Sequence, residues 1–299
     1  MIPVKILWDG INSAGFEDGV MLVFRGYIDE SGNDRGMFTL ACLVGHGPSW
    51  FYIENKWQEV LDQTNASLVL QGRKPLERYH ASDCSNLLGD FEGWSIDEQV
   101  DFVKRLLSAF VNNALHGYGY TINLAEMARE IPETAPNPEG FARVILLQML
   151  MHKICEATLT LYTDSILSLV HDHCDYDAAM LEAFNQILDD SNFRCRHRFT
   201  TLTPMRWQDC LTLQPADLFA YETFKDAERQ SSSRKRRKSL DVILSEASLF
   251  SGSGASFNKP AFEAIKRNID SLDTKTREIL LATARVIKTE NKKKVKRGK

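Results

Sequence analysis

The chain has 299 residues, of which 43% are hydrophobic and 25% are charged, and these values are typical of a globular protein. This length is sufficient to bury a large core without disulfides or metal ions. No stretch reaches the roughly 18 uncharged apolar residues of a membrane helix, so an integral membrane protein is excluded and no membrane partner is expected. Residues 1–10 include Lys5 and Asp9 and no continuous apolar run, so we expect no secretory signal.

The six cysteines are scattered along the chain and never form a C-x-x-C motif. This distribution argues against a disulfide framework and against a standard zinc ribbon. We therefore expect a protein of the reducing cytoplasm.

The formal net charge of −4 conceals an asymmetry between the two ends of the chain. Residues 227–299 carry 19 basic against 8 acidic residues, a net charge of +11, whereas residues 1–226 carry −15. An acidic body with a basic tail favours carboxylates gathered into a site and a tail that contacts phosphates. A solvated surface with a frayed end would give the same asymmetry.

Hydrophobic periodicity and turn residues predict alternating strands and helices from residue 22 onward. The predicted elements are strand 22–28, turn 32–36, strand 38–44, helix 48–65, helix 95–115, strand 118–124, loop 132–138, helix 141–161, strand 165–173, helix 176–188, strand 198–207 and helix 214–227. The first two strands form a hairpin, and Ser95 with Glu98 has the spacing of a capping box. This order predicts an α/β domain with a mixed, partly parallel sheet flanked by helices.

The chain divides into three predicted parts: an N-terminal extension of residues 1–21, a catalytic domain of residues 22–228, and a small basic appendage of residues 229–299. The appendage comprises a flexible basic loop at 231–239, a Gly- and Ser-rich linker at 251–256, helices within 262–287 and a disordered tail. An oligomer or a protein partner remains possible.

Three acidic residues stand where predicted elements meet the edge of the sheet. Asp29 and Asp172 come at the ends of apolar strands, and Asp217 lies on the apolar stripe of the helix 214–227. An unpaired charge on such a stripe is costly, and a bound cation would compensate it. Oxygen ligands of this kind suit Mg²⁺ or Mn²⁺, which support phosphodiester hydrolysis. As an alternative, each acid can serve as a turn or capping residue.

Four segments together resemble the domain of unknown function 3800 (DUF3800) family: Tyr27-Ile-Asp-Glu-Ser-Gly32, Tyr79-His-Ala81, the strand end at Asp172, and Gln214-Pro-Ala-Asp-Leu218. The resemblance covers about residues 22 to 228. It implies a ribonuclease H-like fold, a metal-binding acidic cluster, and a nuclease or other phosphoryl-transfer activity.

The resemblance also implies roles for individual residues. Asp29, Asp172 and Asp217 match the family's metal-binding acids. Asp209 matches an acid that often precedes the final helix, as a further metal ligand. The second acid of the motif is Glu30, expected to take part in catalysis as a secondary metal ligand, although strand alternation would aim it away from Asp29.

A histidine of the family is matched by His80, as a possible proton shuttle that Asp83 could orient. A helix-borne glutamate of the ribonuclease H type has no clear equivalent, and Glu54 is the nearest candidate.

Two further groups of residues indicate a binding function, one for phosphates and one for a metal ion. Five consecutive basic residues would bind nucleic-acid phosphates or form a solvated loop, namely Arg234, Lys235, Arg236, Arg237 and Lys238. The pairs His171 with His173, and Cys195 with His197, offer an alternative zinc site of mixed ligands near Cys174.

The favoured hypothesis is a metal-dependent nuclease that acts on RNA or DNA. A nucleic-acid- or partner-binding protein without turnover, and a hydrolase or transferase acting on a small phosphorylated molecule, are the alternatives. The chain lacks a P-loop, a dinucleotide-binding glycine motif and a serine-hydrolase elbow, so those classes are excluded.

Overall fold

The computed structural model describes residues 22–33, 36–111, 113, 115–162, 165–246, 255–257, 259–271 and 278. The predicted extension of residues 1–21 and the basic tail of residues 291–299 lie outside the described residues, as does most of the predicted linker.

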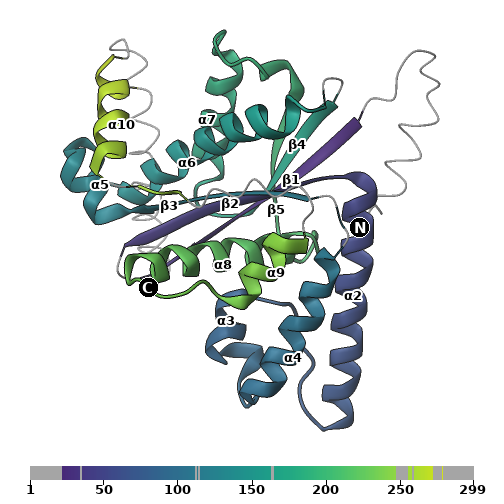
Figure 1. Cartoon of the computed structure of the whole chain (residues 1–299). Coiled ribbons are helices and arrows are strands. Elements are labelled where there is room, and N and C mark those ends of the chain that lie inside the picture. Colours follow the sequence, from purple (N-terminus) through teal and green to yellow (C-terminus); the bar gives the residue numbers. More distant parts are fainter. Residues whose placement is uncertain are drawn as a thin grey trace, which may run out of the picture.

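One mixed sheet with strand order β5-β4-β1-β2-β3-β6 forms the centre of the molecule (Figure 1). Its strands are β1 (Leu22–Gly32), β2 (Met37–His46), β3 (Leu115–Asn123), β4 (Ser165–Asp172), β5 (Phe199–Met205) and the short β6 (Ala255–Ser256). Strands β1, β2 and β3 are antiparallel neighbours, whereas β4 and β5 run parallel to β1. The predicted mixed α/β sheet is confirmed, and the carboxyl ends of β1, β4 and β5 meet at one edge.

The hairpin of β1 and β2 forms as its turn residues predict. The Asn33 side chain accepts a hydrogen bond from the backbone N–H of Met37, and Gly36 has a φ of 79°, which a residue with a Cβ rarely adopts. Both strands are longer than predicted, and β1 continues past Asp29 and Glu30 to Gly32.

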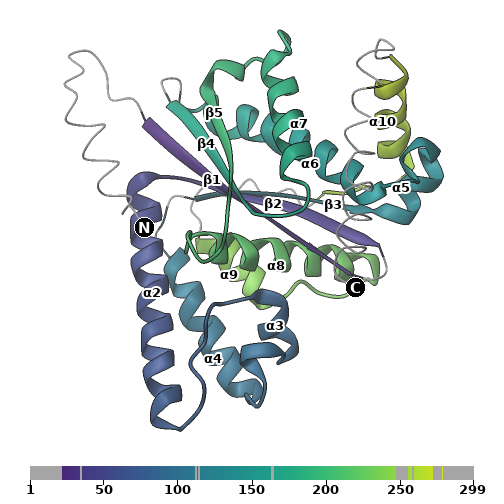
Figure 2. The ribbon, with the colours of Figure 1, turned by 180° about the vertical axis from the view of Figure 1, so that it is seen from behind.

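Helices cover both faces of the sheet (Figures 1 and 2). The α-helices are α2 (Gly47–Leu70), α3 (Ala81–Asn86), α4 (Ile96–Leu107), α5 (Leu124–Glu130), α6 (Pro138–Ile154), α7 (Asp177–Asp189), α8 (Leu213–Ser231), α9 (Lys238–Glu246) and α10 (Lys259–Ser271). One face carries α5, α6, α7 and α10, and the other carries α8 with α2, α3, α4 and α9. None of the described helices is both long enough and apolar enough to cross a membrane.

Helix ends follow local sequence signals. The predicted capping box of α4 is present, since the Ser95 hydroxyl accepts from the Glu98 N–H and the Glu98 carboxylate accepts from the Ser95 N–H. The helix predicted for 141–161 begins earlier, with Pro138 in its first turn, and ends at Ile154, where the chain continues as one π-helical turn.

Part of the region predicted to form a basic appendage after residue 228 packs against the domain. Helix α8 runs through to Ser231, and α9 inserts the buried side chains of Leu240 and Ile243 into the same apolar cluster as α8. Helix α10 buries Phe262 and Ile269 on the opposite face. The described part of the C-terminal region therefore belongs to the core of the domain.

One disulfide differs from the expectation of unpaired cysteines. Cys155, in the π-helical turn after α6, is bonded to Cys195, which precedes β5, with 5.8 Å between their Cα atoms. The two residues are 40 apart in the sequence. Their pairing has no short-range signature, because the folding of α6 against the β4–β5 connection creates it.

We predict that truncating Ile243 destabilises the whole domain. Ile243 is fully buried, and removal of such a side chain costs about 2–5 kcal/mol in the free energy of unfolding. Ile243→Ala should lower the midpoint of urea unfolding as one cooperative transition. The exposed neighbour on the same helix supplies the control, and Val242→Ala should change stability by less than about 1 kcal/mol. Equal, small effects of both variants would place α9 outside the core.

Candidate functional site

A cavity of about 160 Å³ opens where the ends of β1 and β4 meet the start of α8. Its lining includes all five residues predicted to be catalytic, which are Asp29, Glu30, His80, Asp172 and Asp217. The structure thus brings together side chains that are up to 188 positions apart in the chain.

Asp29 and Asp172 are neighbours on two adjacent parallel strands. The register pairs Ile28 with His171, which places the following residues, Asp29 and Asp172, side by side. Residues alternate across a strand, and the neighbours Tyr27 and Val170 pack in the apolar cluster of α8. Both carboxylates therefore face α8.

Asp217 reaches the same cavity from α8. Its carboxylate accepts a hydrogen bond of 2.8 Å from the backbone N–H of Ala81, so it is held at the start of α3. The position on the apolar stripe of the helix is the one that the spacing predicts, because Leu213, Ala220 and Tyr221, three or four residues away on the same face, are buried.

The three acids destabilise one another's charged forms. Burial raises the pKa of Asp29 well above its usual range, and repulsion from Asp217, Glu30 and Asp172 raises it further. Burial raises the pKa of Asp217 to about 6, although His80 and the Ala81 N–H act in the opposite direction. Burial also raises the pKa of Asp172. Burial is the largest cause at all three aspartates, and it outweighs the opposing effect of Arg78 at Asp172 and Asp217.

Glu30 is neutralised from the other side of the sheet. As strand alternation predicts, its side chain points away from α8, and its carboxylate forms an ion pair of 2.8 Å with Arg143 of α6. The Arg143 side chain is only 6% exposed and also contacts Glu139 at 3.0 Å. Glu30 is thus already paired with a buried cation, which distinguishes it from the three aspartates.

His80 lies at the mouth of the cavity and directly precedes α3. Its Nδ1 lies 2.8 Å from the Asp83 carboxylate, so the predicted orienting contact is present. The His80 side chain remains about one-third exposed, with 34% of its surface accessible. This arrangement leaves the imidazole accessible to a bound substrate.

Gln214 positions this part of the site, and the sequence analysis assigned it no role. Its side-chain carbonyl accepts hydrogen bonds from the Trp57 indole N–H at 3.1 Å and from the Tyr79 backbone N–H at 3.0 Å. The residue is buried, and it fixes the segment before His80 against α8. The signals in the sequence were a glutamine within the first turn of an apolar helix and its place in the segment 214–218 that carries the family resemblance.

Arg78 and Trp207 complete the rim; the sequence offered Trp207 only as one of several tryptophans that could stack on a base, and gave no indication of Arg78. The Arg78 guanidinium lies 4.6 Å from the centroid of the Trp207 ring, a cation–π distance, and both side chains line the cavity. They come from separate loops, so no sequence spacing connects them.

Two predicted carboxylates lie elsewhere. Asp209 is exposed in the turn between β5 and α8 and does not line the cavity. Glu54 lies on α2, and it is also absent from the cavity lining. Neither residue is grouped with the three aspartates.

Two arginines of the basic run after α8 form ion pairs with acidic residues of that helix. Arg236 contacts Asp226 at 3.2 Å, and Arg237 contacts the buried Glu222 at 3.2 Å. Arg234, Lys235 and Lys238 are exposed, as a nucleic-acid contact requires. The stretch expected to be a flexible loop is thus anchored to α8 by two arginines.

One of the two residue pairs of the alternative zinc site, Cys195 with His197, cannot bind zinc as predicted. Cys195 is bonded to Cys155, so it cannot supply a thiolate with His197. The other half, around His171 and Cys174, is intact.

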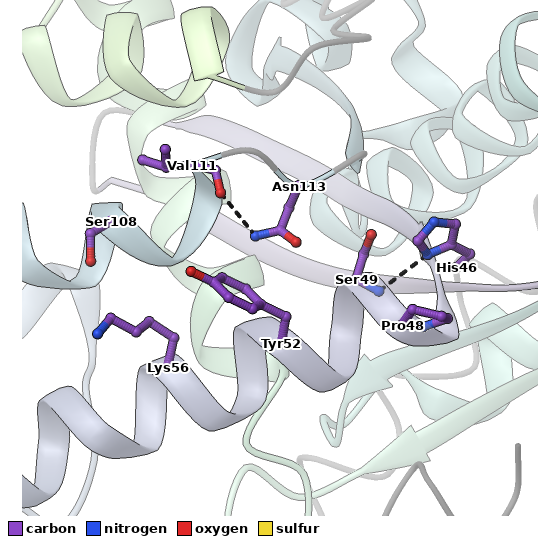
Figure 3. Close-up of a pocket in the computed structure, with 8 residues that line it drawn as sticks. All are labelled: His46, Pro48, Ser49, Tyr52, Lys56, Ser108, Val111 and Asn113. Atoms are coloured by element: carbon purple, nitrogen blue, oxygen red, sulfur yellow. Dashed lines mark hydrogen bonds between the residues drawn. The ribbon is translucent and has the colours of Figure 1, made fainter.

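A larger open cavity of about 840 Å³ lies between the start of α2 and the turn before β3 (Figure 3). It is lined by His46, Tyr52 and Asn113 among others, and its one lysine, Lys56, is paired with Glu59. None of the predicted site residues lines it, so the smaller acidic cavity is the candidate site.

Comparison of the chain with protein-family models, with curated proteins and with solved structures gives no match. The resemblance drawn from the four sequence segments therefore stays a prediction. Function has to be argued from the geometry of the acidic cavity.

We predict that Asp217→Asn stabilises the metal-free protein at neutral pH. The Asp217 pKa is about 6 in the folded state and about 4 when unfolded, so the folded state binds protons more tightly. Its contribution to the unfolding free energy therefore falls as pH rises from about 4 through about 6. Asparagine removes this penalty, at most about 3 kcal/mol.

Urea unfolding with chelator at pH 4 and pH 8 measures the effect. The gain should be present at pH 8 and absent at pH 4, and the exposed Asp101→Asn should show neither. A loss of stability at pH 8 would mean that burial does not disfavour the charged form of Asp217.

Proposed function

We propose that this protein is a metal-dependent nuclease that hydrolyses phosphodiester bonds of RNA or DNA. The observation that carries the proposal is the convergence of Asp29, Asp172 and Asp217 on one cavity, where burial raises the pKa of each and repulsion from Asp217 and Asp172 raises that of Asp29 further. Clustered carboxylates with raised pKa values are typical of functional sites, and such oxygen ligands suit divalent cations.

The donor set fits Mg²⁺ or Mn²⁺. All three side chains offer oxygen, the ligand atom that hard cations prefer. Within the part of the chain that the structure describes, the group whose ligand atoms lie within 4.8 Å of one another is a different one, on the other face of the sheet. The three aspartates share the lining of one cavity, and magnesium sites usually complete their coordination with water and substrate phosphate oxygens.

The fold assignment is part of the same proposal. We infer a ribonuclease H-like domain, and the support is a mixed sheet flanked by helices, with acids at the ends of two parallel strands and on the helix that covers them. Ligand sites form at the carboxyl ends of strands in such sheets.

The residues around the acids suit a phosphodiester. A bound divalent cation would activate water and stabilise the leaving oxygen. Arg78 would bind a non-bridging phosphate oxygen, and Trp207 would present a ring face to a base. His80, held by Asp83, would deliver or accept a proton at its free Nε2. The exposed Arg234 and Lys235 would contact the strand beyond the cavity.

We predict that Asp29→Asn and Asp172→Asn each abolish cleavage. Loss of a metal ligand should reduce the rate by more than about 100-fold, the upper range for loss of outer-shell partners. The assay uses labelled RNA and DNA oligonucleotides with Mn²⁺ or Mg²⁺. Asp209→Asn is the matched control and should keep activity, because Asp209 is exposed outside the cavity.

The same assay distinguishes the alternatives. Turnover of a generic phosphate monoester without cleavage of polymers would identify a small-molecule phosphoryl hydrolase. Salt-sensitive binding of oligonucleotides in chelator, with no product under any condition, would identify a non-catalytic binding protein. Cleavage that Asp29→Asn retains would remove the three aspartates from the mechanism.

We predict that His80→Gln lowers kcat by about 10²–10⁴-fold, the usual contribution of a general acid or base. Affinity for Mn²⁺ should stay unchanged, since the three aspartates remain. His197→Gln, at an exposed position before β5, should have no effect. Equal rates for the two histidine variants would exclude His80 from proton transfer.

A further inference from the structure

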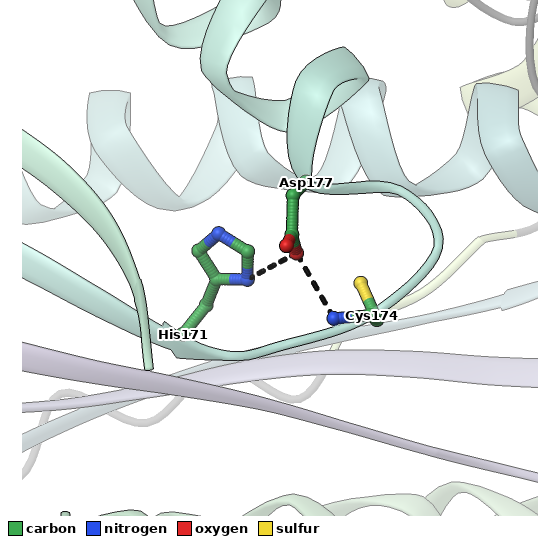
Figure 4. A group of neighbouring side chains, drawn as sticks. All are labelled: His171, Cys174 and Asp177. Atoms are coloured by element: carbon green, nitrogen blue, oxygen red, sulfur yellow. Dashed lines mark hydrogen bonds and ion pairs between the residues drawn. The ribbon is translucent and has the colours of Figure 1, made fainter. Parts of the chain in front are cut away.

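A second group of ligand side chains lies at the end of β4, on the face of the sheet opposite to the acidic cavity. It consists of His171, Cys174 and Asp177, whose ligand atoms all lie within 4.8 Å of one another (Figure 4). Alternation along β4 separates the two sites, because Asp172 faces α8 whereas His171 faces the side of α6 and α7 with Leu169.

The contacts within this group are already those of a nearly formed site. The Asp177 carboxylate accepts a hydrogen bond of 2.9 Å from the Cys174 backbone N–H and lies 3.8 Å from the His171 Nδ1. His173, two residues along the chain from His171, also contacts the Asp177 carboxylate through its Nδ1. Figure 4 shows the His171 ring and the Cys174 thiol on either side of that carboxylate.

We propose that His171, Cys174 and Asp177, joined by His173, bind a borderline-soft divalent cation of the zinc class. Two imidazole nitrogens, one thiolate and one carboxylate oxygen make a complete tetrahedral set. Bond lengths of about 2.0–2.3 Å keep ligand atoms of a tetrahedral zinc site roughly 3.5 Å apart, so His171, Cys174 and Asp177 need to close by only about 1 Å. His173 contacts Asp177 and would turn toward the group to supply the fourth ligand. This site is separate from the proposed nuclease activity and from its Mg²⁺ or Mn²⁺.

Two neighbouring contacts bear on metal binding. The His171 Nδ1 lies 3.0 Å from the Asp172 carbonyl oxygen, a contact that binding at this nitrogen would exchange for a bond to the cation. A thiolate ligand requires that the cation displace the proton of the Cys174 thiol. The Arg143 guanidinium lies 3.9 Å from that sulfur and stabilises the thiolate.

The site would fix the end of β4, where Asp172 is the last residue. Asp177 is the first residue of α7, and His171 is the penultimate residue of β4. A shared cation would therefore tie the start of the helix to the end of the strand. The His173 backbone N–H donates a 3.0 Å hydrogen bond to the Asp172 carboxylate. A structural cation on one face would therefore hold a carboxylate of the other face in place.

Titration of the metal-free, full-length protein with Co²⁺ tests the proposal, because a thiolate ligand gives a near-ultraviolet charge-transfer band that an all-oxygen site lacks. We expect one equivalent of Co²⁺ to produce this band and Zn²⁺ to displace it, following the order of affinities for these ions. Cys174→Ser should abolish the band. Asp177→Asn, which keeps the thiol, should weaken Co²⁺ affinity by at least about tenfold.

Two matched variants keep the result specific. Cys210→Ser removes another unpaired, buried cysteine, and Asp217→Asn removes a carboxylate of the acidic cavity; both should retain the band. Circular dichroism of each variant excludes loss of fold as the cause. Absence of a band in the wild type, or a band that Cys174→Ser retains, would overturn the zinc-class site, whatever the outcome of the cleavage assay.

Discussion

The close packing of α8 against the sheet is the constraint on which the acidic cavity depends. At Gly119 of β3, a Cβ would lie 2.7 Å from the Thr223 side chain of α8, so only glycine lets the helix approach the strand this closely. The same helix presents Gln214 and Asp217 at its start. Its contact with β1 places Asp217 near Asp29, while Gln214 accepts a hydrogen bond from the segment before His80. Helix α8 thus positions Asp217 directly and the segment before His80 through Gln214.

Side-chain alternation divides the chemistry at the ends of β1 and β4 between two faces. Asp29 and Asp172 project toward α8, where oxygen ligands predominate. Glu30 and His171 project toward α6 and α7, where a buried arginine, a thiol and imidazoles gather. A one-residue shift of register in either strand would exchange these sets. The pairing of β1 with β4 therefore decides which donor atoms share a site.

Charge compensation follows the same division. The buried Arg143 balances Glu30 and Glu139, and Arg237 balances the buried Glu222 of α8. No such buried arginine pairs with the three aspartates among the described ion pairs, and burial raises the pKa of each of them. An unbalanced cluster beside balanced ones is the physical basis for proposing a cation there.

Periodicity and turn chemistry are local, so the alternating elements, the hairpin, the capping box of α4 and the grouping of Asp29, Asp172 and Asp217 could be predicted from the residues alone, although β1 continues three residues beyond the predicted strand end at Asp29. The folded arrangement was needed to show that Asp209 and Glu54 lie elsewhere, that Gln214, Arg78 and Trp207 line the cavity, and that α9 belongs to the core. It also paired Cys155 with Cys195 and turned Arg236 and Arg237 toward α8. These features arise from contacts between distant segments, and no local pattern of residues encodes which segments will meet.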